Sequence, residues 1–585
     1  MGSHMARLLV MLMIASMLLA ACGGGDDDDD STATTATSGG AATATTGSTG
    51  DQPTTAADGA TATTGSDAGA TTTTDDSGSA GEGVSGGTLR VAQSRPPDTF
   101  DTDKSASRYN EYITRQIFDS LVNVDAEGTF HPWLATSWEQ SADGLTWTLK
   151  LREGVTFHDG EPFNAEAVKF NFDRVKDPAT RSVTTAGYWG PYEATNVIDD
   201  FTIEVVFSEP YAPFLAIISN ELFGIKSPKA VQEFGEDYGR NPVGTGPFVF
   251  VEWIEGDHVT LRRNEDYNWP PANAKHEGPA YLDEIIYTFP EEPSTRTALL
   301  ESGEVDVITQ VNFSDVEALQ GMDGLSIHTS IIQASAAGML LNTERFPTDD
   351  VEVRKALQYA TNQDELSQLV TFGVEIPNRG VLTPDSWIYY AEEAELYEYN
   401  PEMAEQILEA AGWVDTDGDG IREKDGEALR MNYICFPGGG CSQAEVIQAQ
   451  WKDVGVDLEL LQLNNPANKE ASTRGDHNVR PLSWNHVDPM VLSVMFHPDN
   501  VDEGWSFSRW RAPELAEMLD TATTILDVDE RIQAYKDIQV YIMENSLFIP
   551  TIATTFVVGL SDDVQNFETD ATGYTMYLYD TWLDN

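Results

Sequence analysis

Apolar and polar positions follow two periods over most of the chain. In "TLRVA" (88–92) and "TWTLKLREGVTF" (146–157) they alternate, which is typical of strands with one buried face. In "RYNEYITRQIFDSLV" (108–122) the apolar positions recur every three to four residues, which predicts an amphipathic helix. Helices, several of which lead directly into strands, are likewise predicted in segments 165–175, 293–303, 350–370, 401–413 and 441–461. Because helices and strands alternate to the end without an internal repeat, the pattern predicts a mixed α/β fold with more than one lobe.

The N-terminal part of the chain breaks this pattern. Residues 23–86 consist almost entirely of Gly, Ala, Thr, Ser and Asp, so they cannot bury enough apolar surface to offset chain entropy. They are predicted to form a disordered tether. Upstream, Arg7 precedes an apolar stretch, Leu8 to Ala21, which has the length of an export signal and is too short to span a bilayer as a mature helix. Residues 1–4 look like a vector scar.

The sequences around the three cysteines predict different roles for them. Cys22 ends "LAAC", which resembles the lipobox of bacterial lipoproteins, where the signal (1–22) is cut before the cysteine and the cysteine is lipidated. An exported chain meets an oxidising compartment, and the glycines at 438–440 let the backbone turn back. Cys435 and Cys441 are therefore predicted to form a local disulfide, with metal binding by the two thiols as the alternative.

The charge of the chain limits its partners. Asp and Glu number 96 against 34 Lys and Arg, which gives a formal net charge of −62. Such a charge repels nucleic acid and anionic membrane surfaces, so nucleic-acid binding is excluded and membrane contact is expected only through the lipid anchor. An excess of this size is typical of a saline or an acidic setting.

Four blocks of sequence carry a resemblance to a known family. They occur in the expected order and together span nearly all of the chain beyond the tether. The blocks are "HPWLATSWEQSADGLTWTLKLREGVTFHDGEPFNAEAVKFNFDRV" (131–175), "GTGPFVFVEW…LRRNEDYNW" (244–269), "LNTERFPTDDVEVRKALQYATNQDEL" (341–366) and "AEQILEAAGWVDTDGDGIREKDG" (404–426). They resemble the family 5 solute-binding proteins of bacterial ABC importers, the dipeptide, oligopeptide and nickel-binding group.

This resemblance implies an α/β periplasmic-binding-protein-like fold of two lobes, with an extra subdomain in the first lobe and the ligand cleft between the lobes. The lobes would close by hinge rotation. The implied boundaries are a first lobe at 87–335 with an inserted subdomain at about 125–240, a second lobe at 336–545, and a return to the first lobe at 546–585.

The segment "LSWNHVDPMVLSVMF" (482–496) corresponds to the region where members of this family hold their ligands. Peptide-binding members often have W-x-x-D-x-x-D-P, in which the first aspartate pairs with the amino group of the peptide. This chain has Trp484 and Asp488-Pro489 at a shorter spacing and lacks the first aspartate. Either Asp488 substitutes for it or the ligand has no amine. The predicted ligand contacts are Ser483, Trp484, Asn485, His486 and Asp488.

Trp387, in "VLTPDSWIYY" (381–390), is the second predicted cleft contact, because this loop resembles another cleft-lining segment of the family. Trp387 and Trp484 would supply aromatic walls for a ligand. The alternatives are structural: a core tryptophan beside a capped turn for Trp484, and an aromatic lid over the core of the second lobe for Trp387.

An acidic loop, "DTDGDGIREKDGE" (415–427), matches the start of an EF-hand-type calcium loop. Asp415, Asp417 and Asp419 occupy alternate positions, and Ile421 offers its carbonyl. The twelfth position is Gly426 instead of a glutamate, so Glu423, Asp425 or Glu427 would have to complete the shell. The predicted ligand set is Asp415, Asp417, Asp419, Ile421 and Asp425. A bare acidic surface turn is the alternative.

Taken together, the resemblance implies a monomeric, lipid-anchored extracytoplasmic receptor without catalytic activity. It would capture a peptide and pass it to an ABC permease and its ATPase subunits, with the tether raising the local concentration near the transporter. No cofactor is required, apart from a structural calcium ion if one binds. The same family also binds nickel chelates, glycosides and opines. The rival from another class is a secreted lipid-anchored hydrolase, for which no motif singles out a nucleophile or an acid pair.

Overall fold

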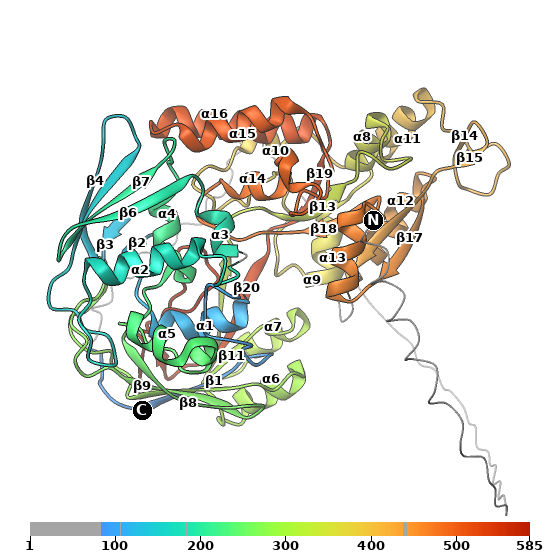
Figure 1. The fold of residues 1–585 in the computed structure, drawn as a ribbon. Coiled ribbons are helices and arrows are strands. Elements are labelled where there is room, and N and C mark those ends of the chain that lie inside the picture. Colours follow the sequence, from blue (N-terminus) through green and yellow to red (C-terminus); the bar gives the residue numbers. More distant parts are fainter. Residues whose placement is uncertain (1–82, 106, 183, 437–440, 585) are drawn as a thin grey trace, which may run out of the picture. The chain divides into compact units, whose positions relative to one another are not determined.

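The computed structural model describes residues 83–105, 107–182, 184–436 and 441–584 (Figure 1). The predicted signal peptide, Cys22 and the predicted tether up to residue 82 lie outside the described residues. Three larger sheets organise the described part of the chain. We refer to the seven-stranded sheet and its helices as the first lobe, to the four-stranded sheet and its helices as the subdomain, and to the five-stranded sheet and its helices as the second lobe.

The seven-stranded sheet is built around β1, whose Leu89 and Val91 are fully buried. Strand β1 pairs in parallel with β10 on one side and with β11 on the other, and the remaining pairs are antiparallel. In sheet order the strands are β12 (Leu325–Ile331), β20 (Thr555–Ser561), β11 (Val307–Thr309), β1 (Thr88–Ala92), β10 (Glu284–Thr288), β9 (His258–Arg263) and β8 (Phe248–Ile254). Helices α1 (Arg108–Ile117), α6 (Pro293–Glu301) and α7 (Phe313–Gln320) contact this sheet.

The subdomain contains an antiparallel sheet in the order β4, β5, β7, β6. Its strands are β4 (Ala135–Gln140), β5 (Thr146–Leu151), β7 (Thr202–Phe207) and β6 (Tyr192–Asp199). Its helices are α2 (Ala165–Lys176), α3 (Thr184–Tyr188), α4 (Phe214–Ser219) and α5 (Pro228–Phe234). It also contains the 3₁₀ turns η1 (Glu221–Phe223) and η2 (Gly235–Arg240) and a hairpin of β2 (Val122–Val124) and β3 (Phe130–Pro132). Helix α2 begins where the Asn164 side chain accepts a hydrogen bond from the backbone of Ala167, which satisfies one free N–H of the first turn.

The five-stranded sheet of the second lobe is apolar on both faces. Met339 and Leu341 of β13 belong to one buried cluster, whereas Leu340 between them belongs to another, as expected for a strand covered on both sides. In sheet order the strands are β17 (Asp457–Gln462), β16 (Arg430–Cys435), β18 (Val479–Leu482), β13 (Ala337–Leu341) and β19 (Phe548–Ile552).

Two sets of helices supply these two clusters (Figure 1). One set is α8 (Val351–Tyr359), α9 (Gln363–Thr371), α11 (Pro401–Ala410) and α12 (Ser442–Asp453), and the other is α14 (Val491–Phe496), α15 (Pro513–Thr524) and α16 (Val528–Glu544). The remaining elements are α10 (Ala391–Ala394), α13 (Asn465–Arg474), η3 (Pro498–Asn500), β14 (Glu423–Lys424), β15 (Glu427–Ala428), β21 (Val564–Gln565) and β22 (Trp582–Leu583).

The chain passes between the two lobes at two neighbouring places. It leaves the first lobe after β12 and returns to it at β20, and these two strands pair from Ile331 and Thr555 onward. In the second lobe, β13 and β19 pair in the same way, with Ala337 opposite Ile552. Since β19 belongs to the five-stranded sheet, the chain returns to the first lobe after 552 and not at 546 as the sequence analysis expected.

Candidate functional site

The predicted ligand segment lies where the two lobes meet. It connects β18 to α14 and is fastened to the crossing segment between β12 and β13. The Trp484 backbone N–H donates to Ser335 Oγ at 2.7 Å, and the Ser335 N–H donates to the Trp484 carbonyl at 3.1 Å. Asn485 forms an isolated bridge with Ala334. The segment is therefore attached to one of the two connections between the lobes, and rotation of one lobe against the other would act on this connection.

Trp484 also reaches across to the subdomain. Its indole N–H donates to the Tyr188 hydroxyl at 2.6 Å, and Tyr188 ends helix α3 of the subdomain. The Tyr188 ring lies 5.0 Å from the His486 ring, and the Tyr188 carbonyl accepts a hydrogen bond from the Tyr211 hydroxyl at 2.7 Å. Trp484 thus joins the second lobe to the subdomain directly.

His486 is buried beside this contact. Its Nδ1 accepts a hydrogen bond from the Asp488 backbone N–H at 3.0 Å, which places the proton of the neutral ring on Nε2. Burial lowers the pKa of His486, so the ring stays neutral near pH 7. Nε2 has no hydrogen-bond partner among the described residues. The ring is thus a neutral donor whose N–H remains available.

Asp488 is occupied by a structural partner. Both of its carboxylate oxygens accept hydrogen bonds from Arg531 of α16, at 2.7 and 2.8 Å, and Oδ1 also accepts from the Met490 N–H. Burial by itself would raise the pKa of Asp488, but the Arg531 guanidinium holds it below its usual range. Since both oxygens are engaged, a ligand amine would have to compete with a buried arginine, and the role of Asp488 as an amine-binding residue stays a prediction.

Trp387 and Asp488 line a cavity of about 340 Å³ between the subdomain and the second lobe. The Trp387 indole donates to the Val487 carbonyl at 2.8 Å, which fixes the ring against the predicted ligand segment. The opposite wall comes from the subdomain and the β2–β3 hairpin, with Phe130, Trp147 and Leu215. We call this space the aromatic cavity.

A second cavity, of about 370 Å³, is lined mainly by the first lobe. Its polar lining residues include Arg115, Asp125, Gln333 and Asp570, and Asp385 of the second lobe also lines it. Ser483, Trp484, Asn485 and His486 line neither this cavity nor the aromatic cavity. The structure therefore divides the predicted contacts: Trp387 and Asp488 line the aromatic cavity, and the other four lie at the junction of the lobes. Of these four, Ser483 is exposed.

Two buried glutamates were missed by the sequence analysis. Glu111 of α1 and Glu221 of η1 are 5% and 4% exposed, and burial raises the pKa of both. The Asp570 carboxylate raises the pKa of both glutamates further, and the Glu221 carboxylate also raises that of Glu111, whereas the hydrogen bond to Glu111 lowers the pKa of Glu221. Burial raises the pKa of Tyr188, and both glutamates raise it further. The pattern of α1 could not reveal this, because an acidic residue in the first turn of an amphipathic helix is ordinarily exposed.

The acidic loop brings four carboxylates together. One oxygen atom from each of Asp415, Asp417, Asp419 and Glu423 lies within 4.8 Å of the others. Asp425 instead sits in the β14–β15 turn with a positive φ of 55°. The oxygen-rich set fits a calcium ion, with Glu423 in place of the predicted Asp425. Calcium binding at this loop stays a prediction.

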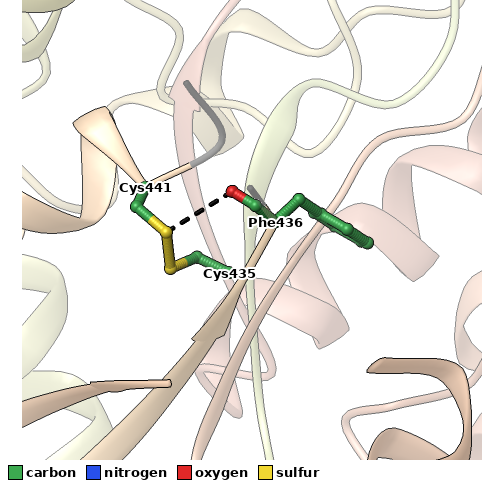
Figure 2. The surroundings of a disulfide bond; sticks show 3 residues. All are labelled: Cys435, Phe436 and Cys441. Carbon is green, nitrogen blue, oxygen red and sulfur yellow. Dashed lines mark hydrogen bonds between the residues drawn. A yellow bond between two sulfur atoms is a disulfide. The ribbon is translucent and has the colours of Figure 1, made fainter. Parts of the chain in front are cut away.

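Cys435 and Cys441 are joined by a disulfide between the end of β16 and the start of α12 (Figure 2). Their Cα atoms are 5.2 Å apart. The Sγ of Cys441 also lies 3.4 Å from the Phe436 carbonyl oxygen, a close contact to a sulfur that carries no proton. The bond therefore fixes the end of β16, next to the strand that leads to Trp484.

No helix among the described residues is both long and apolar enough to cross a bilayer.

Comparison with known proteins agrees over most of the chain. The profile of the family described as bacterial extracellular solute-binding proteins, family 5 Middle, matches residues 129–502. The glutathione-binding protein GsiB of Shigella flexneri serotype 5b is 26% identical over 473 residues, which cover 80% of this chain and 89% of that protein. GsiB of Escherichia coli K12 is also 26% identical with the same coverage.

Solved structures share the fold. The oligopeptide-binding protein AppA from Bacillus subtilis, in complex with a nonapeptide, has a TM-score of 0.71 at 22% identity and covers 86% of this chain and 100% of its own. NikA from Brucella suis, in complex with Fe(III)-EDTA, has a TM-score of 0.76 at 24% identity, covering 85% of this chain and 100% of its own. These matches confirm the predicted fold class.

Proposed function

Since this chain belongs to the bacterial extracellular solute-binding proteins, family 5, we propose that it captures a short peptide between its lobes and delivers it to an ABC permease. The chain is the solute-binding component of an importer, works outside the cytoplasm and is not an enzyme, so the hydrolase alternative is excluded. Two comparisons support a peptide: glutathione, the ligand named for GsiB, is a small peptide, and AppA was solved with a nonapeptide.

The observation that carries the proposal is the contact between Trp484 and Tyr188. A binding protein that encloses its ligand needs groups that meet across the lobes only when the lobes are closed. The hydrogen bond from the Trp484 indole to the Tyr188 hydroxyl joins the second lobe to the subdomain beside the unpaired Nε2 of His486, and we infer that it forms when the lobes close. A ligand enclosed at this junction would stabilise the closed form of the protein, and this stabilisation would raise Tm.

Thermal denaturation of the purified protein with reduced glutathione and with mixed di- to pentapeptides tests the proposal. Binding to the folded state alone raises its stability by mass action, about 2.7 kcal/mol at a hundredfold excess over Kd. We expect a dose-dependent rise in Tm for peptides and native mass spectrometry to detect one bound peptide. A protein that no peptide stabilises would contradict the proposal.

Two conservative variants make this test specific. Trp484→Phe and Tyr188→Phe each remove one end of the same hydrogen bond and keep the ring. Each is expected to weaken peptide binding about threefold to tenfold, and the double variant is expected to weaken it no further than either single one. Trp138→Phe is the matched control, because Trp138 is a half-buried tryptophan of β4 that lines neither cavity.

A non-peptide ligand is the second candidate. The first aspartate of W-x-x-D-x-x-D-P is missing, and Asp488 is engaged by Arg531. If nickel(II)-histidine, a glycoside or an opine raises Tm while peptides do not, the chain binds that ligand class instead.

We further propose that the mature protein is anchored by a lipid on Cys22, through a tether that ends near residue 86. The support is the lipobox-like "LAAC" and the composition of the segment that follows. Expression with a labelled fatty acid tests this, since Cys22→Ser should abolish the label and release the protein from the membrane fraction.

A further inference from the structure

Two buried carboxyl groups meet where helix α1 of the first lobe contacts turn η1 of the subdomain. Glu111 and Glu221 are hydrogen-bonded to each other, which requires that one of them holds a proton. Among the described residues, no Lys or Arg forms an ion pair with either glutamate. A buried carboxylate ordinarily takes a cation as its partner, so the shared proton stands where a cation would be expected.

The two cations that act on this pair are directed at other groups. Burial raises the pKa of both glutamates, and the charges of Arg108 and Arg115 offset this only in part. The Arg108 guanidinium lies 4.9 Å from the Tyr574 ring centre, and Arg115 donates to Ser120 Oγ at 2.9 Å. The third charged neighbour, Asp570, is itself an acid and raises both pKa values further. The pair therefore keeps an uncompensated affinity for positive charge.

A buried hydroxyl shares the helix face of Glu111. Thr114 follows Glu111 by three positions in α1, so the two side chains are neighbours. Thr114 is 0% exposed, and its Oγ1 has no hydrogen-bond partner among the described residues, which is costly for a buried polar atom. The phenols of Tyr112 and Tyr574 also lie near Glu111, and burial raises the pKa of both, so they stay neutral near pH 7. The cluster thus combines two carboxyl groups with an unused hydroxyl acceptor.

The cluster lies near the contact that joins the second lobe to the subdomain. Tyr188, whose hydroxyl accepts from the Trp484 indole, has its pKa raised by burial and further by both glutamates. Asp570 and Arg115, which act on the pair, line the second cavity. A ligand held at the junction or in this cavity would therefore meet the acidic pair.

We propose that Glu111, Glu221 and Thr114 form a subsite for a primary ammonium group of the captured ligand. The three N–H donors of an ammonium group match two carboxyl groups and one hydroxyl. On binding, the ammonium group takes the place of the shared proton, which leaves to solvent, and its hydrogen bonds to the carboxylates are charge-assisted. In the second lobe, by contrast, Asp488 is already held by Arg531. The assignment to a peptide amine rests on the proposed function, whereas binding of an ammonium group does not.

Two kinds of amine probe test the subsite on the purified protein at pH 7.0. In the first arm, thermal denaturation compares a tripeptide mixture with free N-termini and the same mixture after N-acetylation. Calorimetry then gives Kd for the member that native mass spectrometry finds bound. In the second arm, cadaverine, a diamine without a carboxylate, is compared with 1,5-pentanediol, which has the same length and no charge.

Three variants make the test specific. Glu221→Gln removes one acid and keeps the shape of the side chain, and Glu221→Asp keeps the charge. Glu393→Gln is the matched control, because Glu393 is also a buried carboxylate, 1% exposed, and lines neither cavity. Dependence on Glu221 separates the subsite from the general attraction of cations to an acidic protein.

We expect free-amine peptides to bind about tenfold to a hundredfold more tightly than N-acetylated ones, and Glu221→Gln to abolish that preference. Glu221→Asp should retain most of it, and Glu393→Gln should behave as wild type. Cadaverine should raise Tm in wild type but not in Glu221→Gln, and the diol should raise it in neither.

The pH dependence gives a readout that a purely structural glutamate would not affect. Burial, together with Asp570, raises the pKa of Glu221 to about 7, whereas an α-amino group stays charged up to a pH of about 7.7. Affinity for the free-amine peptide should therefore rise about tenfold from pH 5.5 to pH 7.0, as the pair ionises. At pH 6, calorimetry in two buffers of different ionisation enthalpy should show proton release on binding, and Glu221→Gln or an N-acetylated peptide should remove it.

If no peptide binds but cadaverine raises Tm in a Glu221-dependent way, the proposed peptide function fails and the ammonium subsite stands. If peptides bind equally well with free and acetylated amines and cadaverine has no effect, the peptide function stands and this inference is overturned. It is also overturned if no probe has any effect, or if Glu221→Gln retains the preference. Circular dichroism shows whether each variant is folded. Thr114→Val, which removes one acceptor and should reduce the preference about threefold, replaces Glu221→Gln if that variant is unfolded.

Discussion

Two regions of the second lobe bring groups of like charge together, one at the exposed surface and the other largely buried. The loop 415–423 brings four carboxylates together, with three of the four residues exposed, and no basic residue in the described part of the chain forms an ion pair with them. Lys469 and Arg480 bring two cations together against aromatic rings, with Arg480 almost fully buried.

The difference lies in what the solvent does for each region. Water and salt screen the carboxylates of an exposed loop, so that cluster can exist without a counter-ion at little cost. The same screening is weak around a buried guanidinium, so a missing counter-charge there is expensive. Charge clustering on a surface is therefore weak evidence for a ligand, whereas an unpaired buried cation is stronger evidence.

The largest effect is expected where a buried charge loses an existing partner. Asp488→Ala leaves Arg531 buried without its carboxylate and should lower the free energy of unfolding by about 3 to 5 kcal/mol, measured by urea denaturation. Asp502→Ala, in an exposed pair with Arg511, is the control and should change stability little. An Asp488→Ala variant of normal stability that has lost peptide binding would instead make Asp488 a ligand residue.

The next largest effect on stability is expected at a buried carboxylate that has no cationic partner, and this effect depends on pH. Glu393 is 1% exposed, its Oε2 has no partner among the described residues, and burial raises its pKa to about 8. The folded state therefore binds this proton more tightly than the unfolded state, so stability falls as pH rises from about 4.5 to about 8.

Glu393→Gln should remove this loss of stability with rising pH. We expect the variant to exceed the parent by about 2 kcal/mol at pH 9 and to match it at pH 5, measured by urea denaturation at both values. Glu392→Gln, an exposed neighbour in α10, should leave the slope unchanged. Equal slopes for the parent and Glu393→Gln would show that Glu393 is ionised at little cost.

Removing the unpaired cation should cost far less than removing Asp488. Arg480→Met loses cation–π contacts and two hydrogen bonds but also relieves the repulsion of Lys469 and the burial of an unpaired charge. In chloride buffer the free energy of unfolding should change by less than about 1 kcal/mol. A loss of several kcal/mol would show that Arg480 already has a strong partner, and would break the comparison.

The acidic loop should give the smallest effect. Adding 1 mM calcium to protein treated with EDTA is expected to raise Tm by about 1 to 3 °C, because the loop is exposed and a weak site contributes little stability. Asp417→Asn should remove this rise. Asp425→Asn should retain it, since Asp425 lies in the β14–β15 turn and not in the cluster. The same loss in both variants would indicate non-specific screening.

The periodicity of the chain was sufficient to predict most elements. The strand predicted at 88–92 is β1, and the helical pattern at 350–370 resolves into α8 and α9. The helix predicted at 108–122 ends at Ile117, because Phe118 takes an extended conformation. Residue patterns predict which face is apolar, but the end of a helix depends on its neighbours in three dimensions.

The candidate site was harder to predict because its partners are far apart in sequence. Trp484 was named from its motif, but the hydroxyl that it meets belongs to Tyr188. Asp488 was expected to face a ligand, and Arg531, which occupies it, follows in a later helix. Nothing in the sequence around Lys469 or Arg480 shows that both lack a carboxylate, since this depends on every residue that the fold brings near them.

The position of β20 has a consequence for the order in which the molecule can be assembled. This strand lies between β11 and β12 in the seven-stranded sheet, yet it comes after the whole second lobe in the chain. The first lobe therefore cannot close its sheet until almost the entire polypeptide has been synthesised, which favours slow, late folding.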